Sequence, residues 1–108
     1  MNLFSPIKIK DVELRNRIVL SPMCQYKAED GFVKDWHFQH YSRFAFSGLG
    51  AAFVEATGVS PVGRITHGCT GIWNDNHIQG LEKITKIFKE HNCVSGIQLA
   101  HAGRKASF

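Results

Sequence analysis

Residues 50–56, Gly-Ala-Ala-Phe-Val-Glu-Ala, form a short apolar run that follows a glycine-containing turn and leads into a polar loop. Two further runs of this kind occupy residues 17–23 and 94–100. Short, mostly apolar runs bounded by turn residues are typical of strands that are covered on both faces. We therefore predict three buried strands.

Helical segments are expected between these strands. Residues 35–47 begin with Asp35, which can cap the free amides of a first turn, and Gly48 follows in the place of a left-handed terminator. Residues 75–91 form the second segment. Its apolar side chains recur at three- and four-residue spacing: Ile78, Leu81, Ile84 and Phe88. Both segments are predicted to be helices.

Residues 7–14 alternate apolar and polar side chains around a Lys10-Asp11 turn, which predicts a small β-hairpin. The predicted order is then hairpin, strand, helix, strand, helix, strand. Helices that connect sequential strands imply parallel pairing with right-handed crossovers. The fold class is α/β, and no repeat or linker divides the chain.

The length of the chain limits what this fold can be. It has 108 residues, and three parallel strands with two helices bury little core. A closed (β/α)8 barrel needs about 250 residues. We expect the chain to be the beginning of a larger protein.

Composition argues against two classes of partner. Thirteen Lys and Arg against nine Asp and Glu give a net charge of +4, but the basic residues are scattered, so no nucleic-acid surface is expected. No stretch approaches the ~20 apolar residues of a membrane span, and residues 1–6 lack the apolar core of a secretory signal. An odd count of three cysteines suits a reducing compartment. We predict free thiols in a cytoplasmic protein with no membrane partner.

Several side chains offer nitrogen or sulfur donors to a metal. They are His37 and His40, His67 and Cys69, and His91 and Cys93. No Cys-x-x-Cys pair or His-Glu-x-x-His helix accompanies them, so we expect packing and surface roles and no metal site. Residues 48–50 begin like a dinucleotide-binding fingerprint, but they precede a strand and the third glycine is missing.

The residues that could take part in binding or catalysis lie at the ends of the three predicted strands. The carboxyl ends of parallel strands meet at one face, so these residues are expected to lie close together. Cys24 follows the first strand and is either a small buried hydrophobe or, with Tyr26, part of a site. Glu55 and Gln98 lie in apolar runs and need polar partners. Gln98 either bonds to backbone or recognises a flat heterocycle such as a flavin or a nucleobase. Cationic and polar groups follow it: His101, Arg104 and Lys105.

Five segments together resemble the old yellow enzyme family of FMN-dependent ene-reductases. They are residues 21–26, 54–57, 63–66, 71–75 and 96–106. The similarity is to the bacterial-type subclass that carries a cysteine beside the flavin. It covers the whole chain but only the amino-terminal third of the family. The resemblance implies a (β/α)8 TIM barrel, of which residues 1–108 supply the N-terminal hairpin, three strands and two helices of a single FMN-binding domain.

The resemblance also implies a reaction and a site. NADPH or NADH reduces FMN, and flavin N5 then transfers hydride to an activated, α,β-unsaturated alkene. Cys24 would tune the redox potential of the flavin, and Tyr26 and Lys105 would border the substrate. The residues implied to bind the cofactor are Ser21, Pro22, Met23, Cys24, Ala56 and Gln98.

Two functions of different class follow from these expectations. In the first, the chain belongs to a larger, homo-oligomeric flavoenzyme and is inactive alone, because the substrate-holding residues and phosphate loops of the family come later in its sequence. In the second, the chain is a non-catalytic remnant or assembly module that retains a partial flavin site. Continuation of the reading frame past Phe108 would favour the first.

Overall fold

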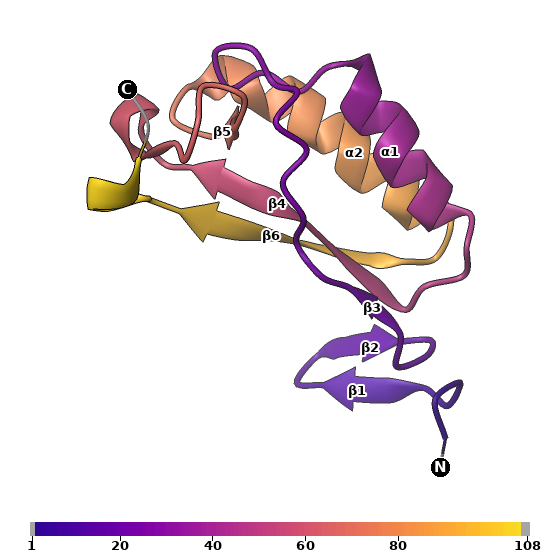
Figure 1. The fold of residues 1–108 in the computed structure, drawn as a ribbon. Coiled ribbons are helices and arrows are strands. Elements are labelled where there is room, and N and C mark those ends of the chain that lie inside the picture. Colours follow the sequence, from indigo (N-terminus) through magenta and orange to yellow (C-terminus); the bar gives the residue numbers. More distant parts are fainter. Residues whose placement is uncertain (1, 107–108) are drawn as a thin grey trace.

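The computed structural model describes residues 2–106 and has a parallel sheet, a helical layer and a separate hairpin (Figure 1). The strands are β1 (Ile7–Ile9), β2 (Val12–Leu14), β3 (Val19–Leu20), β4 (Ala51–Gly58), β5 (Thr70–Gly71) and β6 (Val94–Ala100). The α-helices are α1 (Asp35–Ala45) and α2 (Ile78–Glu90). Short 3-10 turns occupy Pro61–Gly63 (η1), Asp75–His77 (η2) and Gly103–Lys105 (η3).

Strand β4 is the centre of the sheet. It pairs in parallel with β6 along its length, with β3 at Ala51 and Ala52, and with β5 at Thr57 and Gly58. The predicted α/β class with parallel pairing is thereby confirmed. β1 and β2 form the predicted antiparallel hairpin, and Lys10 takes the left-handed conformation of its turn at φ 54°.

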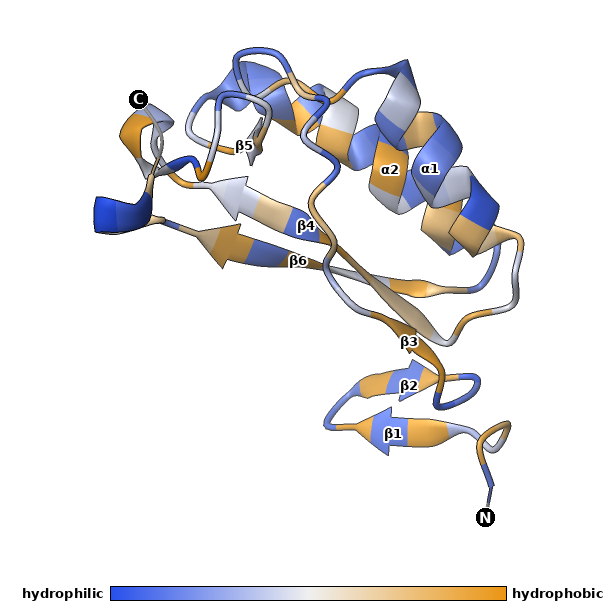
Figure 2. Ribbon diagram, viewed as in Figure 1, coloured by the Kyte–Doolittle hydropathy of each residue, from blue (hydrophilic) through white to orange (hydrophobic). Residues whose placement is uncertain are grey.

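Helices α1 and α2 lie side by side on one face of the sheet (Figure 1). The buried core between the layers consists of Tyr41, Ala45, Ala52, Val54, Leu81, Ile84, Phe88 and Cys93. Hydrophobic and hydrophilic segments alternate along both helices, as expected for helices buried on one side (Figure 2). Within residues 2–106, no helix has the length and apolar composition that crossing a membrane requires.

Within residues 2–106 the opposite face of the sheet is largely open, so covering on both faces is not found for β3 and β6, whereas β4 is buried at seven of its eight positions. Val19 is 46% exposed and Phe53 is 40% exposed on this face. In the described part of the chain only the hairpin approaches it, where Val12 and Leu14 line a cavity with Phe53. An apolar run therefore identified the strands but not what covers them.

The first strand is much shorter than the predicted residues 17–23. After Leu20 the backbone is irregular through Ala28, and Pro22 has no N–H to offer a neighbouring strand. The edge of β4 on this side is occupied further along by β5, which the sequence analysis missed. A two-residue Thr-Gly strand carries no periodicity, so no sequence pattern indicates it.

The helix ends also differ in detail from the prediction. Lys34 caps α1 and Asp35 is already helical, so the predicted cap is shifted by one residue. Gly48 has φ +89°, as expected of a left-handed terminator, and Asn92 has φ +55° after α2. The predicted helix over residues 75–91 is instead the 3-10 turn η2 followed by α2.

The Phe88→Ala substitution is expected to lower the free energy of unfolding by about 3–5 kcal/mol, because it removes a fully buried ring from the core. Phe4→Ala removes the same ring from a side chain that is 70% exposed and should change stability by less than about 0.5 kcal/mol. Urea denaturation of both variants measures the difference. Equal losses would contradict this assignment of the core.

Candidate functional site

A β-bulge interrupts the pairing of β4 with β6 at the strand ends. Two residues of β4, Glu55 and Ala56, oppose one residue of β6, Gln98. The pairs on either side of the shift are Val54 with Ile97 and Thr57 with Leu99. A bulge can re-aim a side chain, and here the consecutive residues Val54 and Glu55 both contact the helical layer. Regular alternation would send them to opposite faces.

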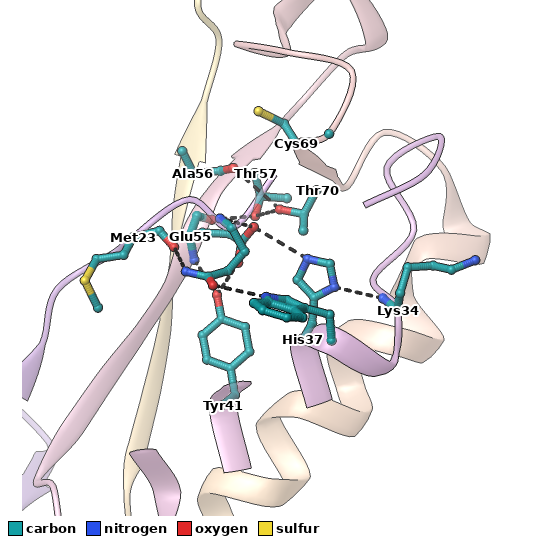
Figure 3. Close-up of polar contacts among 12 residues, drawn as sticks. Met23, Lys34, His37, Tyr41, Glu55, Ala56, Thr57, Cys69 and Thr70 are labelled. Carbon is teal, nitrogen blue, oxygen red and sulfur yellow. Dashed lines mark hydrogen bonds and ion pairs between the residues drawn. The ribbon is translucent and has the colours of Figure 1, made fainter. Parts of the chain in front are cut away.

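The Glu55 side chain is 1% exposed and lies at the centre of a polar cluster (Figure 3). The Tyr41 hydroxyl donates to Glu55 Oε2 over 2.6 Å and accepts from the Glu55 backbone N–H over 3.0 Å. Burial and the adjacent Glu55 raise the pKa of Tyr41, so its hydroxyl remains a donor. These two bonds fix the end of β4 against α1.

His37 faces the same carboxylate from α1, with Nε2 located 3.6 Å from Glu55 Oε1. The other ring nitrogen, Nδ1, accepts the backbone N–H of Lys34 over 2.9 Å and therefore carries no proton. The imidazole is then neutral, with its one N–H on Nε2. This buried nitrogen faces Glu55 but makes no hydrogen bond within the described residues. His37 thus contributes a dipole and no charge to the cluster.

Two threonines close the bulge on the side of β5. Thr57 Oγ1 donates to the Glu55 carbonyl over 2.7 Å and lies 2.8 Å from Thr70 Oγ1. Thr70 Oγ1 also donates to the Ala56 carbonyl over 3.5 Å, so both threonines contact the backbone of the bulge. Both hydroxyl side chains are fully buried. This pair holds β5 to β4 immediately beyond the irregular step.

The segment after β3 is attached to the cluster through Gln25. Its backbone N–H donates to Glu55 Oε1 over 3.3 Å, and its side-chain Nε2 donates to the Met23 carbonyl over 3.0 Å. Trp36 Nε1 on α1 donates to Gln25 Oε1 over 3.1 Å. The next residue, Tyr26, has φ +56°. Side chains of β4 and α1 therefore determine the course of residues 23–26.

Cys24 is half-buried beside the bulge. Burial raises the pKa of its thiol, the nearby Cys69 and Glu55 raise it further, and hydrogen bonds from the Ala56 backbone and the Tyr26 side chain act in the opposite direction. Cys24 in turn raises the pKa of the exposed Tyr26. At neutral pH both groups are protonated. The structure thus brings Cys24, Tyr26 and Ala56 together, as the convergence of strand ends predicts.

Gln98 lies on the open face of the sheet, the face of Phe53 and Gly96, because alternate residues of β6 share a face. Its side chain is exposed, and within residues 2–106 no hydrogen-bond partner is found for its carboxamide. The expectation that an apolar strand buries Gln98 is therefore wrong. The carboxamide remains available to a ligand.

The other predicted site residues are exposed or half-exposed near the strand ends. Ser21 and Met23 are exposed and Pro22 is half-buried in the irregular segment after β3. Lys105 is exposed in η3. The residue before this turn, Ala102, attaches it to the loop after β4, because its N–H donates to the Gly63 carbonyl over 2.8 Å.

The sequence analysis missed the residues that support this site. Tyr41, Trp36 and Thr70 show no pattern that separates them from ordinary helix and loop residues. For His37 the sequence predicts only a packing or surface role, with metal binding as the alternative. One signal was available, because Glu55 in an apolar run requires buried donors and the preceding helix is the first place to seek them.

The chain belongs to the NADH:flavin oxidoreductase / NADH oxidase family, whose model matches residues 2–108. The NADPH dehydrogenase of Bacillus subtilis is 52% identical over 106 residues, and that of Geobacillus thermodenitrificans is 51% identical over 106 residues. Each comparison covers 96% of this chain and 31% of the relative. The chain thus spans about a third of the length of these curated relatives.

Solved structures show the same arrangement. Morphinone reductase matches with a TM-score of 0.87 and 26% identity, covering 96% of this chain and 27% of that one. Old Yellow Enzyme from Pichia sp. AKU4542 matches with a TM-score of 0.88 and 28% identity, covering 97% and 28%. These confirm the resemblance to old yellow enzymes, and the parallel fold corresponds to part of their TIM barrel.

We expect alkylation of Cys24 by iodoacetamide to be half-maximal at a higher pH than in an unfolded peptide, because only the thiolate reacts and burial raises the pKa of this thiol. Cleavage after Lys and Arg places Cys24 in a peptide of residues 18–27 that contains no other cysteine, so mass spectrometry can follow it separately. The synthetic peptide 18–27 is the control. A midpoint at or below that of the peptide would contradict the assignment.

Proposed function

We propose that this chain forms the ring-binding side of an FMN-dependent NAD(P)H oxidoreductase that reduces activated alkenes. The observation that carries the proposal is the exposed carboxamide of Gln98 on the open face of the sheet. In the strand pairing, Gln98 of β6 lies beside Glu55 and Ala56, the two bulge residues of β4. A carboxamide presents a donor and an acceptor together, which matches the alternating N–H and C=O groups of a flavin pyrimidine ring. Membership of the flavin oxidoreductase family supports this reading.

The remaining residues fit the same ring. We assign Ser21, Pro22 and Met23 to one side of it, together with Cys24 at the redox-active edge and Ala56 through its backbone. When bound, FMN supplies two-electron chemistry, taking hydride from NADPH or NADH and passing it to the β-carbon of the alkene while the α-carbon gains a proton. Tyr26 and Lys105 are both exposed and polar, and we assign them to the substrate side.

The work of the protein residues is positioning and polarisation. The raised pKa of Cys24 keeps its sulfur protonated, so the thiol can donate a weak hydrogen bond to a flavin oxygen or nitrogen. We also propose a cytoplasmic, homo-oligomeric enzyme whose partner is a small molecule and not a nucleic acid. The three cysteines are free, which agrees with a reducing compartment.

Protein expressed from the complete reading frame is expected to bind FMN and to oxidise NADPH or NADH when an α,β-unsaturated ketone is added. Flavin fluorescence quenching measures binding, and nicotinamide absorbance with and without the ketone measures turnover. A protein without flavin, even after FMN is added, would contradict the proposal. Flavin binding without ketone-dependent oxidation would limit it to NAD(P)H dehydrogenation.

The 108-residue chain alone serves as the comparison in this experiment. We expect weak FMN binding and no turnover, because the described strand-end groups Cys24, Ala56 and Gln98 address the ring and not the phosphate. The exposed edge of β6 should also favour self-association. Micromolar FMN binding without turnover by the chain alone would favour the alternative of a non-catalytic flavin-binding module.

The substitution Cys24→Ala is expected to shift the midpoint potential of bound FMN and to leave measurable turnover, because the thiol modulates the flavin and forms no bond to the substrate. Potentiometric titration and steady-state assay measure the two effects. Cys93→Ala is the control, since Cys93 is buried in the helical core away from the strand ends. Complete loss of turnover with FMN still bound would instead indicate a covalent role for Cys24.

A further inference from the structure

The carboxylate of Glu55 is a buried negative charge without a cationic partner in the described part of the chain. Among residues 2–106, His37 is the only basic side chain within 4.0 Å of the carboxylate, and its tautomer is neutral because Nδ1 accepts an amide proton. The carboxylate accepts hydrogen bonds from Tyr41 and Gln25. His40 on α1 is a further titratable group that interacts with it: burial lowers the pKa of His40, and Glu55 acts in the opposite direction. A buried charge of this kind is costly to the fold, and such groups are concentrated at functional sites.

The hydrogen bonds of this carboxylate connect three parts of the structure. Oε2 accepts from the Tyr41 hydroxyl on α1, and Oε1 accepts from the backbone N–H of Gln25. Gln25 lies between Cys24 and Tyr26, the two residues proposed to face flavin and substrate. A change at Glu55 is therefore transmitted to both residues through one peptide group.

We propose that Glu55 is a positioning residue for the flavin site: its carboxylate fixes residues 24–26 against β4 and places an uncompensated negative charge behind Cys24. This inference rests on the proposed FMN-dependent function. It extends that function to a residue whose side chain is buried on the helical side of the sheet, away from the open face that carries Gln98. Its influence reaches the site through the Gln25 amide and through its electric field.

The electrostatic consequence has a definite sign. The pKa of the Cys24 thiol is raised first by burial and then by the nearby Cys69 and Glu55, while hydrogen bonds with the Ala56 backbone and the Tyr26 side chain act in the opposite direction. The part due to Glu55 has the sign expected of a negative charge, which opposes formation of a thiolate. The same charge opposes the accumulation of electrons on a nearby flavin ring. Removing the charge of Glu55 should therefore favour both thiolate formation at Cys24 and reduction of the bound flavin.

The test is Glu55→Gln in the protein from the complete reading frame, because glutamine keeps the shape and an acceptor oxygen for Gln25 while it removes the charge. We expect the midpoint potential of bound FMN to become more positive. In the flavin-free protein, we expect the midpoint of Cys24 alkylation to move to lower pH. Groups that face Cys24, namely Tyr26 and Cys69, are unchanged in this variant.

Ile84→Val, a mild truncation in the core, is the control for a purely structural effect. It should lower the melting temperature and leave both midpoints at their wild-type values. If Glu55→Gln also lowers only the melting temperature, Glu55 is structural and the inference is wrong.

Tyr41→Phe provides a second test should Glu55→Gln fail to fold. It retains the carboxylate and removes the 2.6 Å hydrogen bond from the Tyr41 hydroxyl, so the negative charge acts more strongly on its surroundings. The midpoint potential of bound FMN should then become more negative, and the midpoint of Cys24 alkylation should move to higher pH. Unchanged midpoints would overturn the inference. If the wild-type protein binds no FMN, the proposed function fails, whereas the alkylation measurement still decides whether Glu55 acts on Cys24.

Discussion

The carboxylate of Glu55 is buried where the sheet, helix α1 and the segment after β3 meet, and its hydrogen bonds join all three. Carboxylate oxygens accept and cannot donate, so each neighbour must present an N–H or O–H. Tyr41 and Gln25 satisfy this requirement, whereas Nε2 of His37 lies 3.6 Å from the oxygen that Gln25 contacts and makes no hydrogen bond in the described part of the chain. The positions of α1 and of residues 23–26 therefore follow from one group on β4.

The bulge in β4 is the structural device that makes this arrangement possible. It turns Glu55 toward the helical layer directly after Val54, and it leaves Ala56 and Gln98 at the strand ends. The polar side chain that anchors the site is thus buried on the helix side, and the carboxamide that remains available lies on the open side. One irregular step in the pairing therefore separates the buried supporting side chain from the exposed carboxamide.

The two faces of the sheet differ accordingly in what they contribute. The helical face carries a dense core around Ile84 and Phe88, which gives the sheet a rigid backing. The other face exposes Val19 and Phe53 and carries Gln98. Packing on the helical face therefore holds the residues of the open face in position. Functional side chains generally need such support to keep their geometry.

The sequence by itself determined the α/β class, the order of the hairpin, the three longer-range strands and the two helices, and the position of Ala56 and Gln98 near the ends of β4 and β6, because apolar periodicity and turn residues are local signals. It placed Cys24 directly after a strand, whereas β3 ends at Leu20 and Cys24 lies in the irregular segment that follows. The several linked motifs also identified the family. Tertiary structure alone decided the bulge, strand β5 and the exposure of Gln98, since these depend on which strand lies beside which residue. It also decided that Glu55 is bonded to Tyr41 and Gln25. Fourteen residues separate Glu55 from Tyr41 and thirty separate it from Gln25, and no local pattern predicts a hydrogen bond between groups so far apart.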